Sequence, residues 1–168
     1  MSNPLSHISL SNPWHLLATG FGSGLSPIVP GTMGTLASIP LFLLLAQLPL
    51  SIYLVVVLVS CIIGVKICQV TSDDMGVHDH GSIVWDEFAG FWITMIIVPA
   101  LNIPVTEWKW LLLGFVLFRF FDMVKPWPIG WLDKRIHGGL GIMIDDIVAG
   151  AMAGIALWLI GQYLGWLG

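Results

Sequence analysis

The sequence is poor in charge, in basic residues and in cysteine. Only 10% of its 168 residues are charged and 57% are hydrophobic, whereas about a quarter of the residues in a soluble domain are charged. This composition excludes a separate soluble domain and indicates one membrane-embedded domain over residues 1–168. Six Lys and Arg against ten Asp and Glu leave no basic surface for nucleic acid. Two cysteines, Cys61 and Cys68, are too few for a disulfide framework.

Long uncharged runs predict an all-α, polytopic helical bundle with four or five membrane segments. No Lys or Arg precedes the first run, so we expect that run to be retained rather than cleaved as a signal. It either crosses the bilayer or dips into it as a re-entrant helix, because Pro40 lies inside it. In the last run, Gly150 and Gly154 would let a neighbouring helix, or a second copy in an oligomer, approach closely. The five expected segments are 36–48, 52–70, 88–100, 111–121 (opened by Trp108 and Trp110) and 147–167.

Five crossings would place most polar sequence on one face of the membrane. That face would carry the N-terminus and the loops 71–87 and 125–146, whereas the turn 49–51, the loop 102–109 and the C-terminus would lie on the other. Because basic residues favour the cytoplasmic side, we expect the first face to be cytoplasmic. It would hold five of the six basic residues: Lys66, Arg119, Lys125, Lys134 and Arg135.

Two acidic doublets stand where membrane helices are expected to begin, Asp86-Glu87 and Asp145-Asp146. Each doublet alone is typical of a helix cap that complements the helix dipole. Two doublets on one face would repel each other unless a cation neutralised them. Because the ligands would all be oxygens, the pattern favours Mg²⁺ or Mn²⁺ over zinc.

Arg119, Asp122 and Lys125 follow at spacings of three, which places them on one helical stripe near the same face. The stripe could be a ladder of ion pairs at the surface. Equally, Asp122 could face a metal while Arg119 or Lys125 faces the oxygens of a phosphate.

A loop rich in Gly, Pro, Ser and Thr leads into the first hydrophobic run, over residues 21–35. Such a loop can present backbone N–H groups and hydroxyls, here those of Ser23, Ser26 and Thr32, to a phosphate. It lacks the Lys of a P-loop, so a capped entry into the bilayer is the alternative. The stretch from His78 to His80 is interpreted as a solvated loop, and His137-Gly138-Gly139 as a flexible turn.

The motifs in their order resemble those of the bacterial phosphatidylglycerophosphatase A family. The resemblance runs from about residue 12 to the C-terminus. It rests on Gly22-Ser23-Gly24-Leu25-Ser26-Pro27, Pro30-Gly31-Thr32-Met33-Gly34, Asp86-Glu87-Phe88-Ala89-Gly90, Phe118-Arg119-Phe120-Phe121-Asp122 with Lys125-Pro126, and Asp145-Asp146.

The resemblance implies a Mg²⁺-dependent lipid phosphatase of the bacterial inner membrane that converts phosphatidylglycerophosphate to phosphatidylglycerol and inorganic phosphate. On this hypothesis Mg²⁺ and catalysis depend on five carboxylates, and the phosphate is bound by two cations and the Ser/Thr loop. The expected catalytic and metal-binding residues are Asp86, Glu87, Asp122, Asp145 and Asp146; the expected phosphate-binding residues are Arg119, Lys125, Ser23, Ser26 and Thr32.

Two other classes of protein are compatible with the sequence. Carboxylates at membrane helices also mark ion or proton transporters, although such a route needs ionisable groups near the middle of the bilayer or on both faces. A structural subunit would leave the acidic doublets with no role beyond capping.

Overall fold

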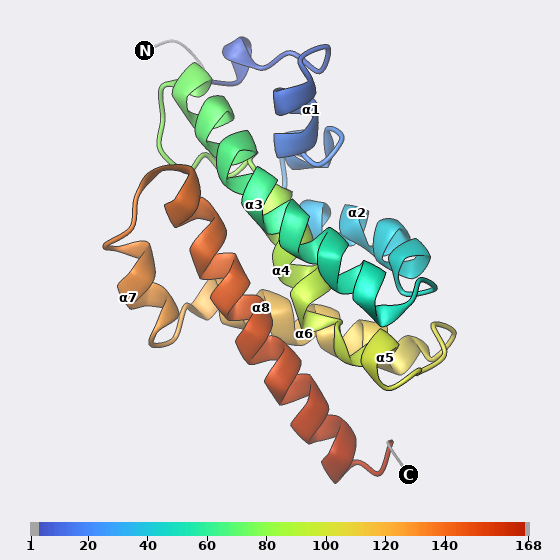
Figure 1. The fold of residues 1–168 in the computed structure, drawn as a ribbon. Helices are drawn as coiled ribbons and strands as arrows, with labels where there is room; N and C mark the ends of the chain where they lie inside the picture. Colours follow the sequence, from blue (N-terminus) through green and yellow to red (C-terminus); the bar gives the residue numbers. More distant parts are fainter. Residues whose placement is uncertain (1–3, 167–168) are drawn as a thin grey trace.

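A computed structural model describes residues 4–166 and shows only helices there, which confirms the all-α expectation (Figure 1). Short helices precede the bundle and link its parts, and four helices of 16 or more residues form most of the chain. In chain order the helices are η1 (Pro4–His7), α1 (Pro13–Ala18), η2 (Ser23–Leu25), α2 (Pro30–Leu45), α3 (Leu50–Met75), α4 (Trp85–Thr94), α5 (Ile97–Ala100), α6 (Trp108–Val124), α7 (Ile129–Asp133) and α8 (Gly138–Tyr163).

The first two predicted segments are found as the consecutive helices α2 and α3, joined by a short turn, but the two do not pack along each other as a hairpin, because α2 packs on α4. Pro30 opens α2 and Pro49 caps the start of α3, positions where the missing N–H of proline costs nothing. Gly76, with φ of 67°, ends α3. With 26 residues α3 is about 39 Å long, more than the hydrocarbon thickness of a bilayer.

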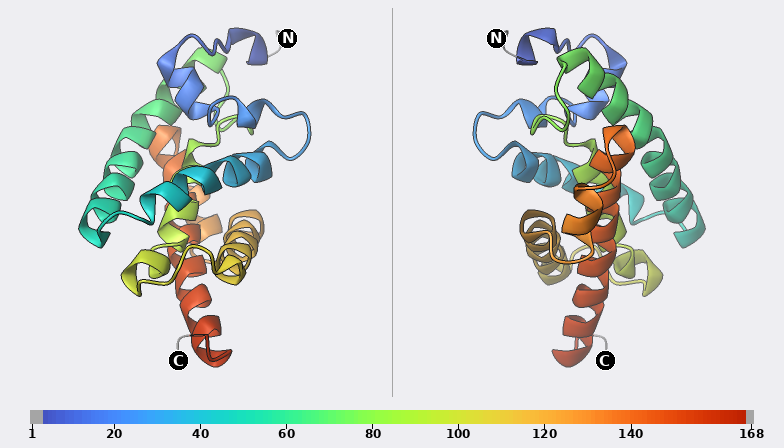
Figure 2. Two further views of the ribbon diagram at one scale, coloured as in Figure 1. Left: turned by 90° about the vertical axis from the view of Figure 1, so that its right-hand side faces the viewer. Right: turned by 90° about the vertical axis from the view of Figure 1, so that its left-hand side faces the viewer.

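The third predicted segment, 88–100, is divided between two helices, because the chain breaks after α4 and resumes as the four-residue α5. Ten residues make α4 only about 15 Å long, half the hydrocarbon thickness. Every residue from Trp85 to Trp92 is buried, since α2, α3, α6 and α8 all pack on α4 (Figures 1 and 2). The apolar character of α4 therefore serves the interior of the protein.

The last segment begins earlier than expected. We placed its start near residue 147 with Asp145-Asp146 as a cap, but α8 begins at Gly138, so both aspartates lie two turns inside the helix. The interpretation of residues 137–139 as a flexible turn is also wrong. The Gly138 N–H donates to His78 Nε2 (2.7 Å) and the Gly139 N–H to Gln69 Oε1 (2.7 Å). These bonds fix the first turn of α8 against α3 and the loop that follows it.

Two helices in the described part of the chain, α3 and α8, are long and apolar enough to cross a membrane. Their outward faces carry large apolar side chains, for example Leu58 at 60% exposure and Ile155 at 60%. A helix on the surface of a soluble protein would be polar there. The exposed faces therefore indicate association with lipid.

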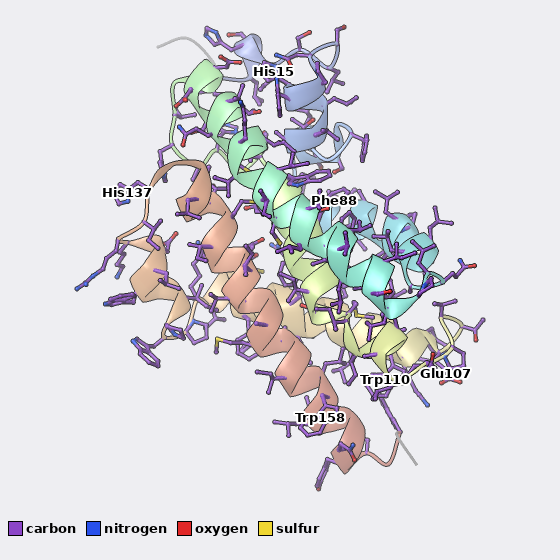
Figure 3. The ribbon with its side chains drawn as sticks, in the orientation of Figure 1. His15, Phe88, Glu107, Trp110, His137 and Trp158 are labelled. Atoms are coloured by element: carbon purple, nitrogen blue, oxygen red, sulfur yellow. The ribbon has the colours of Figure 1, made fainter. Side chains whose placement is uncertain are left out.

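The loops gather at two opposite ends, in the grouping expected from the sequence. At one end, His15 of α1 contacts Asp74 of α3 (2.9 Å) and the loop before α4 pairs with α1 through Val84 N–H and the Ala18 carbonyl (2.7 Å). At the other end, Trp110 packs edge to face on Trp166 (5.3 Å between centroids). Figure 3 labels His15 and Trp110 at these opposite ends, with Phe88 of α4 between them.

Candidate active site

The contact between α4 and α8 brings Asp86 and Asp146 together. Gly90 of α4 packs directly on Gly150 of α8: a Cβ added to Gly150 would come within 3.1 Å of the Gly90 Cα. One turn further along α4, Thr94 Oγ1 donates a hydrogen bond to the Gly150 carbonyl (3.2 Å). Asp86 and Asp146 each lie four residues before one of these glycines, hence one turn earlier on the same face. The two aspartates are buried, at 9% and 2% exposure.

Both aspartates keep a buried oxygen without a hydrogen-bond partner, Oδ1 of Asp86 and Oδ2 of Asp146. Their charges are close enough to repel each other and those of Glu87, Asp122 and Asp145. Buried carboxylate oxygens are costly when left unpaired. A positive ligand at this point would remove that cost.

A second group of contacts joins α2, α4 and α6 around Glu87. The Glu87 carboxylate accepts hydrogen bonds from Thr35 Oγ1 and Arg119 Nη1, and the same Arg119 nitrogen lies 2.7 Å from Asp122 Oδ2. Gly31 of α2 passes so close that a Cβ there would clash with Glu87 and lie 3.2 Å from Arg119 Nη2. Arg119 Nε, buried, has no partner and is therefore a free donor in this group.

Lys125 forms a third group, which links the end of α6 to α7 and α8. Its Nζ lies 2.5 Å from Asp145 Oδ2 and 3.0 Å from Asp133 Oδ1. Burial opposes the charged form of Lys125, but the bonds to Asp145 and Asp133 outweigh it and raise its pKa above the usual value. Lys125 therefore stays protonated in this structure.

The expected stripe of Arg119, Asp122 and Lys125 is confirmed for its first pair only. Arg119 and Asp122 form the i, i+3 ion pair. However, α6 ends at Val124 and Lys125 has φ of 45°, so its side chain leaves the stripe. The charge that was expected beside Asp122 instead neutralises Asp145.

The structure does not bring the hydroxyls of Ser23 and Ser26 to the carboxylates. Ser23 Oγ donates to the Thr19 carbonyl (3.4 Å) and Ser26 Oγ to the Ile28 carbonyl (3.0 Å), both within their own loop. Thr32, in the first turn of α2, is half-buried. The hydroxyl that does reach the site is that of Thr35, one helical turn after Gly31.

Asp79 and Asp133 are site residues that the sequence analysis missed, and Thr35 was included only as the last residue of the loop 21–35. Asp79 was assigned to a solvated loop and is indeed exposed, but its charge acts on Asp86 and Asp145. The position of Thr35 four residues after Gly31, on the same face of α2, was a usable signal. Asp133 gave no signal in the sequence, because its ion pair with Lys125 forms only through the turn that follows α6.

The donor set suits a magnesium ion, although the ligands are not assembled. Within residues 4–166, no three His, Cys, Asp or Glu side chains are already grouped as a metal site. The reason is that Glu87 and Asp122 form ion pairs with Arg119, and Asp145 forms one with Lys125. The unpaired oxygens of Asp86 and Asp146 remain. Carboxylate oxygens are the ligands that Mg²⁺ prefers, so these residues fit the ion.

The fold and the site together define an all-helical, membrane-associated protein with a buried acidic centre bordered by Arg and Lys. Comparison of the sequence with known proteins identifies the family within this class. The sequence pattern of phosphatidylglycerophosphatase A matches residues 16–161. The chain belongs to the phosphatidylglycerophosphatase A family.

Two relatives cover nearly the whole chain, and both are named phosphatidylglycerophosphatase A. The protein of Escherichia coli (strain K12) is 58% identical over 158 residues, 94% of this chain and 89% of the relative. The protein of Haemophilus influenzae is 50% identical over 163 residues, 96% of each chain. No solved structure matches the chain.

Proposed function

We propose that this protein hydrolyses the terminal phosphate of phosphatidylglycerophosphate, leaving phosphatidylglycerol and inorganic phosphate, in a Mg²⁺-dependent reaction. The names of its relatives support the substrate. The observation that carries the chemistry is the pair of unpartnered carboxylate oxygens on Asp86 and Asp146, buried in a cluster whose other carboxylates pair with Arg119 and Lys125. The transporter alternative has less support, since α3 carries no charge from Leu50 to Val65.

Asp86 and Asp146 would hold the ion, and one or two of Glu87, Asp122 and Asp145 would complete its ligand set once their cations turn to the substrate. When bound, Mg²⁺ supplies positive charge for the phosphate oxygens and lowers the pKa of water at the site. The carboxylates that do not bind the ion would accept the proton of the attacking water.

Arg119 and Lys125 would bind the phosphate. Arg119 offers the unpartnered Nε and two terminal nitrogens in one plane, a geometry that matches two phosphate oxygens. In the structure both cations are held by carboxylates, so a phosphate dianion would exchange one anionic partner for another. Negative charge that spreads over the phosphoryl oxygens in the transition state would then face two fixed cations.

The protein would cross the inner membrane several times, with this site toward the cytoplasm. We propose that α2, α3, α6 and α8 cross the bilayer and that α4 with α5 carries the chain back inside the protein, so that the chain passes between the two sides five times. Most basic residues and the catalytic carboxylates would then share the cytoplasmic side. A substrate whose chains stay in the bilayer can present its headgroup there without leaving the membrane.

Release of inorganic phosphate from phosphatidylglycerophosphate in mixed micelles tests this function. We expect release in Mg²⁺ and its loss in excess EDTA, with recovery when Mg²⁺ is restored. A metal that binds Asp86 and Asp146 should also raise the melting temperature of the protein without substrate, because a ligand that binds only the folded state stabilises it. Release that is indifferent to EDTA would refute the metal, and absence of release from folded protein would refute the function.

Thr35 offers a finer test of the site, since its hydroxyl is one of two donors to Glu87. Thr35→Val keeps the shape and removes the donor, so we expect kcat to fall about tenfold, or about 1.4 kcal/mol. Thr35→Ser restores the hydroxyl and should restore most of the rate. Equal rates for the two variants would show that this hydrogen bond has no part in the reaction. Phosphate release at saturating lipid measures the effect.

A further inference from the structure

The outer face of α6 is apolar between Lys109, near the start of the helix, and Arg119. Leu112, Val116 and Met123 are exposed by 54%, 52% and 72%. Their spacing of four and seven places them on one stripe of the helix, which we call the α6 stripe. Arg119 lies between Val116 and Met123 on the same stripe. Arg119 is the one charged residue of the stripe between Leu112 and Met123, and a charge at the edge of a lipid-facing surface marks function.

Arg119 connects this outer surface to the buried carboxylates. Its guanidinium turns inward to Glu87 and Asp122, and its side chain remains 14% exposed. The deeper Glu87 and Asp145 side chains are 9% and 7% exposed. Arg119 is thus more accessible than these deeper carboxylates, and Lys125, directly after α6, is more accessible still at 28%.

Two other sides of the site, toward α8 and toward α3, are closed by packing. Between α4 and α8 the backbones touch at Gly90 and Gly150. Toward α3, Gly64 lies against Met143 and Trp85, where a Cβ would come within 2.9 Å of each side chain. The left view of Figure 2 shows α6 at the periphery, on the side of the molecule away from α3.

We propose that the phospholipid substrate binds along the α6 stripe, with its terminal phosphate at Arg119 and an acyl chain against Val116 and Leu112. This inference rests on the proposed function and adds the route by which the lipid reaches the site. Arg119 matches the charge of the phosphate, and the stripe matches the chain. From Arg119 to Leu112 the helix rises about 10 Å, enough to accompany the headgroup into the upper part of a chain.

A second apolar surface competes for the chain, a groove of about 460 Å³ between α4, α5 and α8. Its lining includes Ile93, Gly154, Ile155 and Trp158. The groove begins beyond the Gly90–Gly150 contact, which separates it from Asp86 and Asp146. A chain in this groove would have no open path to the carboxylates.

The α6 stripe would fix the position of the acyl chain while contributing little to the binding free energy. Lipid chains are as apolar as Leu and Val side chains, so transfer of a chain from the bilayer to the stripe gains little free energy. Truncation of stripe residues would therefore change affinity little. A test must locate the chain or obstruct it.

Photocrosslinking locates the chain. The probe is phosphatidylglycerophosphate with a photoreactive group in one acyl chain, bound to the wild-type protein in EDTA micelles so that it is not consumed. We expect adducts between residues 112 and 123 that unlabelled phosphatidylglycerophosphate displaces. Phosphatidylcholine with the same chain should give adducts that no competitor displaces. Displaceable adducts at 93–97 or 151–158 would overturn the proposal in favour of the groove.

A bulky side chain in the stripe obstructs the lipid. We expect Val116→Trp to raise the KM for the long-chain lipid about fivefold, with kcat unchanged and no effect on a short-chain, water-soluble analogue. Ile155→Trp, which fills the groove on another exposed face, is the matched control and should leave KM unchanged. A KM effect at 155 and none at 116 would refute the placement while phosphate release by the wild type still upheld the function. Failure of the wild type to release phosphate would instead refute the function itself.

Discussion

Asp86→Asn and Asp146→Asn should each lower phosphate release by roughly a hundredfold to a thousandfold, while the protein stays folded. Both side chains are buried and both keep an unpartnered oxygen. Asparagine has nearly the same shape but no charge, so it removes a ligand without opening a cavity. Losses of this size are typical when one group that stabilises charge in a transition state is removed.

The same substitutions should stabilise the metal-free protein. Each removes a buried charge that four neighbouring carboxylates repel, and leaving a buried polar group unpaired costs about 1–3 kcal/mol. We therefore expect the melting temperature in EDTA to stay level or rise, and the Mg²⁺-induced increase to disappear. A protein damaged by the substitution would instead melt earlier in both conditions.

Asp73→Asn is the control for this pair of variants. Asp73 is an exposed carboxylate in the last turn of α3 that accepts a hydrogen bond from Gln69 (2.8 Å). Its loss should leave phosphate release within a factor of about two, as is usual for surface substitutions. Full turnover by Asp86→Asn or Asp146→Asn at saturating Mg²⁺ would contradict the assignment of these residues.

The sequence predicted most helices because an uncharged run and its flanking prolines are local features. The consecutive helices α2 and α3, the position of α6 and the existence of α8 follow from them. It did not predict that α4 is a short interior helix, since a helix buried in protein and a helix buried in lipid have the same apolar composition. Only the neighbours that surround Trp85 to Trp92 distinguish the two, and they come from all parts of the chain.

Both acidic doublets were identified from the sequence, but the structure changes the position of one of them within its helix. Both doublets were expected at the starts of helices, which holds for Asp86-Glu87 in the first turn of α4, whereas Asp145 and Asp146 lie within α8, where capping cannot explain them. The spacing of Gly150 and Gly154 predicted close approach of a helix, and α4 is that helix. The use of this surface within the chain does not test the expected oligomer, which stays a prediction.

Partners far apart in sequence could not be predicted. Thr35 and Glu87 are 52 residues apart and Glu87 and Arg119 are 32 apart. No local pattern links them, because their contact depends on α2 and α6 both packing on α4. The same limit explains why Ser23 and Ser26 were expected at the site: their residue types fit a phosphate, but the path of their loop leads elsewhere.

The close contact of α4 with α8 should make Gly150→Ala a severe substitution. A Cβ at this position would clash with the Gly90 carbonyl and come within 3.0 Å of its carbon, and backbone atoms cannot rotate away. Overpacking of this kind costs about 1–3 kcal/mol, against a gain of about 1 kcal/mol from the higher helix propensity of alanine. We expect a lower melting temperature in detergent.

The effect of Gly150→Ala on phosphate release should exceed its effect on stability. Separation of α4 from α8 moves Asp86 away from Asp146, and a displacement of about 1 Å in a reacting group can cost about a hundredfold in rate. Gly154→Ala is the matched control one turn later, where the nearest atom to the new Cβ is the Thr94 carbonyl oxygen at 3.2 Å. That variant should keep most of its activity and its stability. Equal rates for Gly150→Ala and Gly154→Ala would mean that the distance between Asp86 and Asp146 does not govern the reaction, and the centre of the site would then have to lie with Glu87 and Arg119.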